Sequence, residues 1–215
     1  MKKPRVLMAD DHSLILAGLR KLVEEECDVV GTVEDGRALV EAAQRLRPDL
    51  ILLDISMPLL NGLEAARQLR KLVPESKLIF LTMHASPTYA TEAFQVGASG
   101  YLLKRSAASE LSLAVRSVLQ GQHYLTPSLT KDVLESVLKP ATGEAGKAGP
   151  AGLTDRQREV LQLVAEGRGT KEIATILNVS VKTVEFHKTR IMQQLDIHTT
   201  ADLTKYAITH GITGL

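Results

Sequence analysis

Acidic, hydroxyl and ammonium side chains directly follow short apolar runs in the first half of the chain. These residues are Asp10, Asp11, Asp54, Thr82 and Lys104. Polar residues often end strands, so any one of these positions alone is weakly informative. Together they form a donor set suited to phosphoryl chemistry, because a carboxylate can attack phosphorus while a lysine and a hydroxyl bond the phosphoryl oxygens.

Three carboxylates placed close together repel one another and need positive charge nearby. Lys104 supplies one positive charge, and a hard divalent cation on oxygen ligands would supply the rest. Mg²⁺ fits best, because it binds few carboxylates together with a phosphate. Asp54 is the better candidate nucleophile, since Asp10 and Asp11 form an adjacent pair suited to holding metal. Spacing alone leaves this division of roles open.

The elements that must position these residues are short apolar runs that alternate with segments of helical period. The runs span 6–9, 29–33, 50–53, 78–81 and 100–103, and the helical segments span 14–26, 36–47, 62–72, 87–97 and 107–120. This alternation predicts a doubly wound α/β domain with a five-stranded parallel sheet covered on both faces. Ligands of such sheets bind beyond the carboxyl ends of the strands. A closed eight-stranded barrel needs far more residues.

The chain divides at a Gly-, Ala- and Pro-rich stretch from Pro140 to Gly152, whose composition is typical of a flexible tether. Before it, the apolar pattern of 128–139 indicates a short amphipathic helix. We therefore predict a first domain over 1–122, a linker over 123–149 and a second domain over 150–215.

Composition excludes several classes of protein. The 215 residues are 44% hydrophobic and 24% charged, with a net charge of +1, which excludes a polycationic nucleic-acid coat protein. The single cysteine excludes a disulfide framework and a cysteine-rich zinc site. Apolar stretches are too short to span a membrane, and the start of the chain does not resemble a signal peptide. We expect a soluble, cytoplasmic protein.

The C-terminal sixty residues have a fully helical pattern. Thr154 and Gln157 form a capping-box signature, and Val160, Leu161 and Val164 follow as a buried stripe that should end near Gly167. Three more helices follow. The first is short and capped by Thr170, and a turn at 178–179 leads to a long helix capped by Ser180 that runs to about Leu195. The last helix runs from Thr199 or Thr200 to near Gly211. Short helix, tight turn and long helix is helix-turn-helix spacing. On pattern alone, a small helical protein-interaction module fits equally well.

Helical geometry sorts the long helix into two faces. Val184, His187, Ile191 and Leu195 should pack inward, with His187 a packing residue rather than a DNA contact. The outward positions are Lys182, Glu185, Phe186, Thr189, Arg190 and Gln193, with Lys188 at the flank. Three cations and one acid between residues 182 and 190 form a weak electrostatic footprint for phosphate, at a helix half that carries positive dipole.

The acidic pair at 10–11, LILLDISMPLLNG at 50–62, LT at 81–82 and YLLK at 101–104 resemble the receiver domain of two-component response regulators over residues 4 to about 121. The resemblance implies a flavodoxin-like fold in which Asp54 accepts a phosphoryl group from a sensor histidine kinase. It implies that Mg²⁺ is positioned by Asp11 and Asp54, by Asp10 largely through water, and by the Ser56 backbone carbonyl.

The same resemblance makes Thr82 and Tyr101 the switch pair whose reorientation reports phosphorylation. A core aromatic is the alternative for Tyr101. Asn61 stands where many receivers have Asp, and Arg105 stands where many have a cis-proline. His84 lies beside the expected site, where an incidental loop histidine is the simpler interpretation than a general base.

The segment LTDRQREVLQLVAEGRGTKEIATILNVSVKTVEFHKTRIMQQLDIHTTADLTKYA at 153–207 resembles a LuxR-type helix-turn-helix. The resemblance implies that the helix after Ser180 enters the major groove of double-stranded DNA. Relatives contact bases at the positions of Glu185, Phe186 and Thr189, and phosphates at those of Lys182, Thr183 and Lys188. Together with the receiver, this small four-helix domain resembles the NarL/FixJ family.

The combined resemblance implies a phosphorylation-controlled transcription regulator that forms a homodimer when phosphorylated, and not an enzyme. Phosphorylation would either unmask the recognition helix or change dimerisation, with the last helix as the DNA-bound dimer contact. Two alternatives remain. The first is a ligand-sensing or phosphorylation-independent LuxR-type regulator. The acidic residues argue against it, because pockets for small apolar ligands are lined by apolar and aromatic side chains. An aspartyl-phosphate phosphohydrolase typically has a D-x-D after one strand, which this chain lacks.

Overall fold

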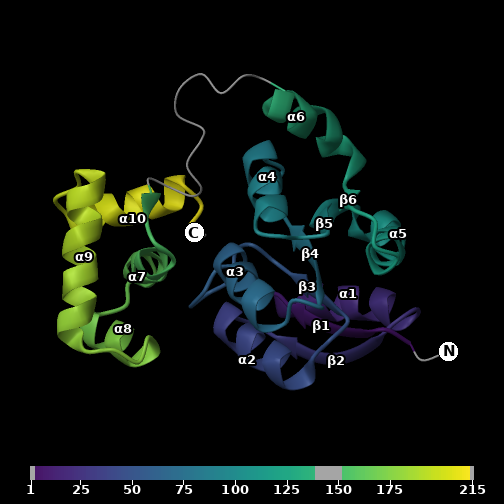
Figure 1. Ribbon diagram of the computed structural model, residues 1–215, viewed down its shortest axis with the longest axis horizontal. Coiled ribbons are helices and arrows are strands. Elements are labelled where there is room, and N and C mark those ends of the chain that lie inside the picture. The colour runs from purple at the N-terminus through teal and green to yellow at the C-terminus, as the bar shows by residue number, and fades with distance from the viewer. Residues whose placement is uncertain (1–2, 139–151, 214–215) are drawn as a thin grey trace.

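The computed structural model describes residues 3–138 and 152–213, which form an α/β domain and a helical domain (Figure 1). Most of the predicted tether at Pro140–Gly152 lies outside the described residues. Within the described residues, no helix combines the length and the apolar character needed to cross a bilayer.

The sheet of the first domain is parallel throughout and has the order β2-β1-β3-β4-β5-β6. Its strands are β1 (Arg5–Ala9), β2 (Asp28–Val33), β3 (Leu50–Leu53), β4 (Lys77–Thr82), β5 (Gly100–Leu103) and β6 (Tyr124–Leu125). The five predicted runs all form strands, within one residue at either end. The structure adds a sixth strand, β6, which was not predicted because a strand of two residues is too short to show a periodic pattern. It pairs with β5 through Gly100 and Tyr101.

Helices cover both faces of the sheet, as the alternating pattern predicts. They are α1 (Ser13–Glu24), α2 (Gly36–Leu46), α3 (Gly62–Leu72), α4 (Pro87–Gln95) and α5 (Ala107–Leu119). One apolar core lies between the sheet and α1 with α5, and a second lies between the sheet and α2, α3 and α4. Strands β3 and β5 are buried throughout, which explains why their sequences are continuous apolar runs, whereas the edge strand β2 is only partly buried.

Helix α6 (Pro127–Leu138) packs against α4. Leu129 is buried and Val133 is partly buried against the core that α4 also covers. The predicted amphipathic segment is therefore a helix that continues the first domain.

The second domain consists of α7 (Asp155–Ala165), α8 (Thr170–Ile176), α9 (Val181–Leu195) and α10 (Thr200–Thr209). The capping box of Thr154 and Gln157 is present, and Ser180 and Thr199 cap α9 and α10. The prediction that Thr170 caps α8 was wrong by one residue. Gly169 is the cap; it has no side chain to accept a hydrogen bond, and its own N–H donates to the Glu172 carboxylate at 2.8 Å.

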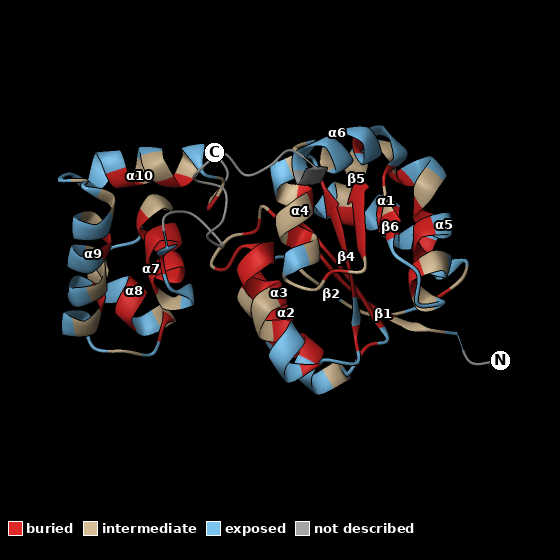
Figure 2. Ribbon diagram, turned by 45° about the horizontal axis from the view of Figure 1, so that its top comes forward, coloured by how far each residue is buried: buried red, intermediate tan, exposed pale blue. Residues whose placement is uncertain are grey.

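The two domains meet along α7. Figure 2 shows buried residues along α7 and at the start of α3, which lies opposite it. Helix α9 lies on the side of α7 away from the sheet, and the chain after α10 returns toward the α/β domain (Figure 1). The recognition helix predicted from the sequence is therefore remote from the domain contact.

Candidate functional site

The strand register brings the predicted acidic residues to one edge of the sheet. Ala9 pairs with Leu53, so Asp10 and Asp54 follow paired positions on neighbouring strands. The Lys104 ammonium, which follows β5, lies 2.7 Å from an oxygen of Asp10 and 2.7 Å from an oxygen of Asp54. All three side chains are buried, between 3% and 4% exposed. The result is a buried cation shared by two carboxylates.

Charge pairing outweighs burial at this lysine. Burial alone lowers the pKa of Lys104, but the neighbouring Asp54 and Asp10 carboxylates raise it further, so its pKa lies above the usual value. Lys104 therefore remains a cation, which is the form that can bond a phosphoryl oxygen.

Asp11 and His12 complete the cluster on its solvent side. The Asp11 side chain is 35% exposed, and His12 Nδ1 lies 2.8 Å from it and 3.2 Å from Asp10. One ligand atom from each of Asp10, Asp11, His12 and Asp54 lies within 4.8 Å of the others. His12 could not be predicted from the sequence, because a histidine after two acids has no spacing pattern of its own.

The donor set of this cluster fits Mg²⁺. Three of its four members offer carboxylate oxygen, the ligand that this hard ion prefers, and one edge of the cluster is open to solvent. The Asp54 carboxylate also accepts a hydrogen bond of 2.6 Å from the Ile55 N–H, which fixes one of its oxygens. The cluster can thus hold a cation beside a carboxylate whose orientation is fixed.

The predicted switch residues meet at His84 instead of touching the acids. Thr82 is fully buried, and its hydroxyl accepts from the His84 N–H at 3.3 Å. The Tyr101 hydroxyl donates to the His84 carbonyl at 2.7 Å, and burial raises the pKa of Tyr101 well above its usual value. Ser56, whose hydroxyl lies 2.8 Å from His84 Nε2, joins the same group of contacts.

The loop that follows Asp54 is held by the second domain. Gln162 of α7 is fully buried; its Oε1 accepts from the Asn61 N–H at 2.8 Å, and its Nε2 donates to the Met57 carbonyl at 2.9 Å. Glu166 accepts from the Leu59 N–H at 3.1 Å. Two side chains, Gln162 of α7 and Glu166 directly after α7, therefore bind three backbone groups of the loop over residues 55–61.

Leu59 contacts the second domain through both its backbone and its side chain. Its φ is +64°, a left-handed conformation that is uncommon for a leucine. Its side chain packs against the apolar core of the second domain. Asn61 adds a bond from its Nδ2 to the Ile212 carbonyl at 3.1 Å, just beyond α10.

Buried ion pairs surround this loop. Arg158 of α7 contacts Glu64 of α3, and both side chains are under 10% exposed. Glu159 accepts from Arg37 of α2 and from Gln68 of α3, each at 3.0 Å. Burial raises the pKa of Glu64, although Arg158 and Arg67 oppose that shift. The domain contact is therefore polar. Among the buried side-chain nitrogen and oxygen atoms of the described residues, only Arg37 Nε has no hydrogen-bond partner.

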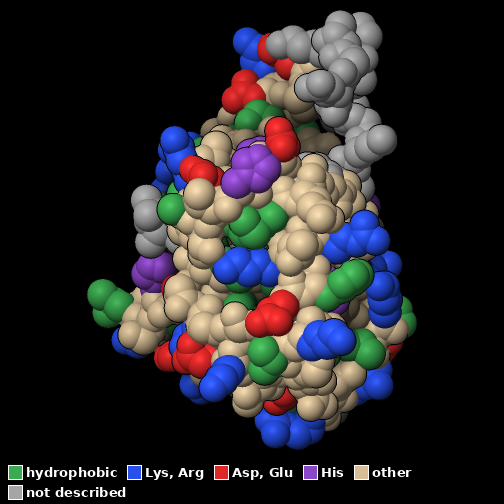
Figure 3. All heavy atoms as spheres, turned by 90° about the vertical axis from the view of Figure 1, so that its left-hand side faces the viewer, with side chains coloured by type: hydrophobic (Ala, Val, Ile, Leu, Met, Phe, Trp, Pro, Cys, Tyr) green, Lys and Arg blue, Asp and Glu red, His purple; other side chains and the backbone are tan. Residues whose placement is uncertain are grey.

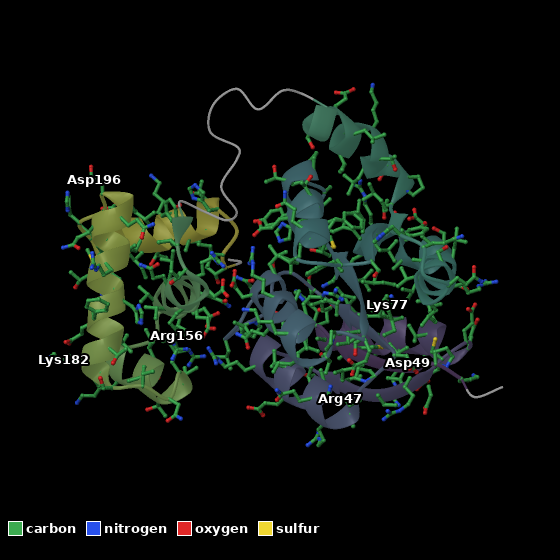
Figure 4. The ribbon with its side chains drawn as sticks, in the orientation of Figure 1. Arg47, Asp49, Lys77, Arg156, Lys182 and Asp196 are labelled. Carbon is green, nitrogen blue, oxygen red and sulfur yellow. The ribbon has the colours of Figure 1, made fainter. Side chains whose placement is uncertain are left out.

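The predicted DNA-contacting side chains lie on the outer surface of α9. Lys182, Glu185, Phe186 and Thr189 are exposed, whereas Thr183 and Lys188 are partly exposed. Figure 3, which faces this side of the molecule, shows Lys and Arg side chains among Asp and Glu rather than a continuous basic patch. In Figure 4, Lys182 and Asp196 mark the two ends of α9, both on the side away from the α/β domain.

Packing places the other side chains of α9. Val184 and Ile191 are buried and His187 is half-buried, as predicted for the inward face. The Arg190 guanidinium lies 5.6 Å from the centre of the Phe186 ring, which orients both groups on the surface. The Lys188 ammonium donates to the Thr200 hydroxyl at 2.9 Å, so α10 positions it.

Comparison with known families assigns both halves of the chain. Residues 6–116 match the response regulator receiver domain, and residues 151–207 match the bacterial regulatory proteins of the luxR family. The first match covers β1 to β5, apart from the first residue of β1, together with the acidic cluster, and the second covers α7 to α9 and most of α10.

Relatives align over nearly the whole chain. The response regulator UvrY of Escherichia coli K12 is 34% identical over 209 residues, which covers 96% of this chain and 94% of UvrY. The oxygen regulatory protein NreC of Staphylococcus epidermidis is 39% identical over 213 residues, which covers 95% and 96%. The RcsB response regulator of Salmonella typhimurium has a similar structure, with a TM-score of 0.65 and 29% identity over all of both chains. A solved RcsB–DNA complex matches with a TM-score of 0.59 and 30% identity, over 95% of this chain and 98% of RcsB.

Proposed function

The chain belongs to the NarL/FixJ family of two-component response regulators, as a transcription regulator with a receiver and a LuxR-type DNA-binding domain, and from this we propose that Asp54 is its phosphoacceptor. The phosphoryl group would come from a sensor histidine kinase. The bond between phosphorus and the kinase histidine nitrogen breaks, and a bond to an Asp54 carboxylate oxygen forms.

The observation that supports this proposal is the shared lysine. Lys104 already lies 2.7 Å from an Asp54 oxygen, so its ammonium is in place to neutralise charge on an incoming phosphoryl group. Thr82 ends the neighbouring strand β4, and a rotation of its side chain would turn its hydroxyl from the His84 N–H toward that group. We assign Lys104 and Thr82 to stabilising the phosphoryl group, with Thr82 and Tyr101 as the switch pair.

We assign Mg²⁺ to Asp10, Asp11, Asp54 and the Ser56 backbone carbonyl. When bound, Mg²⁺ supplies positive charge to the phosphoryl oxygens and offsets the repulsion among the three carboxylates. Asp11 is the exposed member of the set, so it offers the solvent side of the site. Asp10 is paired with Lys104, which fits an interaction of Asp10 with Mg²⁺ made largely through water.

We propose that α9 binds the major groove of double-stranded DNA. Its exposed side chains at Glu185, Phe186 and Thr189 would contact bases, and those at Lys182, Thr183 and Lys188 would contact phosphates. Two copies of the chain would bind as a homodimer, with α10 as the contact between DNA-bound domains. We place the receiver at 1–122 and the DNA-binding domain at 150–215, in a cytoplasmic protein. The segment 123–149 connects them, and its first part, β6 and α6, packs on the receiver.

Phosphorylation would act through the loop over residues 55–61. This loop follows Asp54 directly, and Gln162 of α7 together with Glu166, directly after α7, binds three of its backbone groups. A phosphoryl group adds about one negative charge to the carboxylate it modifies. A loop that moves to accommodate this group must rearrange its bonds with Gln162 and Glu166, so the domain contact changes with it.

Incubation with Mg²⁺ and acetyl phosphate, followed by intact mass, tests the phosphoacceptor. We expect one phosphoryl group on the wild type and none on Asp54→Asn. DNA affinity for a full operator and for an isolated half-site, with and without the phosphodonor, tests the switch. Affinity for the full site should rise on phosphorylation, while half-site affinity should change little because the outer face of α9 is already exposed.

Each alternative gives a different result in the same experiments. Full-site affinity that is equal in wild type and Asp54→Asn, with and without phosphodonor, would indicate a phosphorylation-independent regulator. Repeated turnover of a phosphomonoester would indicate a phosphohydrolase. Absence of an adduct, with no binding of the phosphoryl mimic beryllofluoride, would overturn the assignment of Asp54.

A further inference from the structure

His84 is contacted from four directions at once. Its ring nitrogen Nε2 lies 2.8 Å from the Ser56 hydroxyl, on the loop after Asp54. Its backbone N–H donates to Thr82, and its carbonyl accepts from Tyr101. Its ring also lies against the Tyr89 ring of α4, with 4.7 Å between centroids and 33° between planes. One half-buried residue therefore contacts the loop over residues 55–61 (the acceptor loop), both switch residues and α4.

Tyr89 extends these contacts to the DNA-binding domain. Its hydroxyl lies against Gly211, just after α10, so closely that a Cβ atom on Gly211 would overlap it. Gly211 has a φ of +63°, so the absence of a side chain there serves both the backbone turn and the tyrosine. The next residue, Ile212, accepts from the Asn61 side chain. The end of α10 is therefore held by the receiver at two adjacent residues.

An incidental loop histidine would not have this set of contacts. Its backbone would not bond both switch residues while its ring bridges a loop hydroxyl and an aromatic ring of another helix. Only the ring contacts depend on the identity of residue 84, because its backbone hydrogen bonds would persist with any side chain at this position.

We propose that the His84 side chain is a positioning residue that transmits the state of Asp54 to the Tyr89–Gly211 contact, and thereby to the end of α10. Movement of the acceptor loop displaces Ser56, and movement of the switch pair displaces the His84 backbone. Both displacements shift the ring that packs on Tyr89. The proposal rests on the proposed function, since it needs Asp54 to change state.

Fluorine NMR of the full chain with 3-fluorotyrosine tests the proposal. The chain has four tyrosines, so four signals are expected, and Tyr→Phe variants assign them. The signal of Tyr101 reports the switch and that of Tyr89 reports the domain contact. Gly211→Ala supplies a reference for a disrupted contact, because its new Cβ displaces the Tyr89 hydroxyl without altering the receiver sequence. Mg²⁺ with beryllofluoride, a phosphoryl mimic, changes the state of Asp54.

In the wild type we expect the mimic to shift both signals, with the Tyr89 signal moving toward its position in Gly211→Ala. In His84→Ala the Tyr101 signal should still shift, whereas most of the Tyr89 shift should be lost. His84→Phe keeps a ring on Tyr89 but loses the Ser56 bond, so its Tyr89 signal should start near the wild-type position and respond less to the mimic. His123→Ala is the matched control, since His123 also has an aromatic partner, Phe94, in α4, and it should behave as wild type.

A full Tyr89 shift in His84→Ala, or a wild-type Tyr89 signal that stays fixed while Tyr101 responds, would overturn the proposal. If the mimic shifts neither signal and does not bind, the proposed function fails instead, and the transmission role fails with it.

Discussion

Replacement of Gln162 by alanine should separate the two domains without unfolding either of them. The Gln162 side chain is fully buried between the domains and bonds two backbone groups of the acceptor loop, the Asn61 N–H and the Met57 carbonyl. It makes no contribution to the sheet itself. Its loss should therefore weaken docking much more than the stability of the receiver.

The expected magnitude follows from the groups left behind. In the docked form of Gln162→Ala, one amide and one carbonyl are buried without their partner, and each such group costs about 1–3 kcal/mol. Both groups regain water when the domains separate. Docking should thus weaken by about 2–6 kcal/mol, which is a change of roughly 30- to 20,000-fold in the docking equilibrium.

Amide hydrogen exchange at Leu59 measures this equilibrium, because its N–H donates to Glu166 across the domain contact and keeps that acceptor in Gln162→Ala. Exchange at Leu59 should accelerate by the same factor as docking weakens, while amides within β3 keep their protection. Gln68→Ala is the matched control. Gln68 bonds Glu159 across the same contact at 3.0 Å, but it is half-buried and Glu159 keeps two arginine partners, so the effect should stay below about 1 kcal/mol. Exchange at Leu59 that is indistinguishable between the two variants would refute this reasoning.

Three further predictions concern other parts of the molecule. Lys104→Met leaves two buried carboxylates without their cation and should lower the free energy of unfolding by about 3–5 kcal/mol, with partial recovery in Mg²⁺, as measured by urea denaturation. Phe186→Ala should weaken specific DNA binding by about 1–3 kcal/mol, whereas Lys182→Ala should weaken all sequences alike and reduce the salt slope by about 1, as measured by fluorescence anisotropy. Burial raises the pKa of Glu166, against opposing bonds from Gln162 and Leu59, so the docked form binds protons more tightly than the separated form. Exchange at the Leu59 amide should therefore slow, after correction for its intrinsic pH dependence, as pH falls from the raised pKa to the ordinary value near 4.5, and Glu166→Gln should remove that change.

The acidic cluster was predictable because its positions depend on the sheet alone. Buried parallel strands have continuous apolar sequences, and their carboxyl ends meet at one edge. Asp10, Asp54 and Lys104 therefore come together once the five apolar runs are identified, and the register confirms that they do. His12 was not predictable, since its contact depends on a side-chain rotamer that no pattern specifies.

The domain contact could not be predicted, because periodicity reports which residues are apolar and not what covers the polar ones. The pattern of α7 predicts a stripe at Val160, Leu161 and Val164, and these residues are buried. It leaves Arg158 and Gln162 for solvent, yet both are less than 10% exposed against the receiver. Polar residues buried between domains resemble surface residues in sequence, since their partners lie about 100 residues away.

The arrangement of the domains also limits how phosphorylation can act. Masking of the recognition helix would require the receiver to cover α9, but α9 lies on the far side of α7 from the receiver (Figure 1), and its predicted DNA-contacting residues are exposed or partly exposed. The receiver instead holds the chain just after α10, through Asn61 at Ile212 and through Tyr89 at Gly211. Helix α10 is the element that the proposed function assigns to pairing of DNA-bound domains. Docking in this form therefore constrains how two DNA-binding domains can pair, while it leaves each one free to contact a half-site, and this favours control of dimerisation over unmasking.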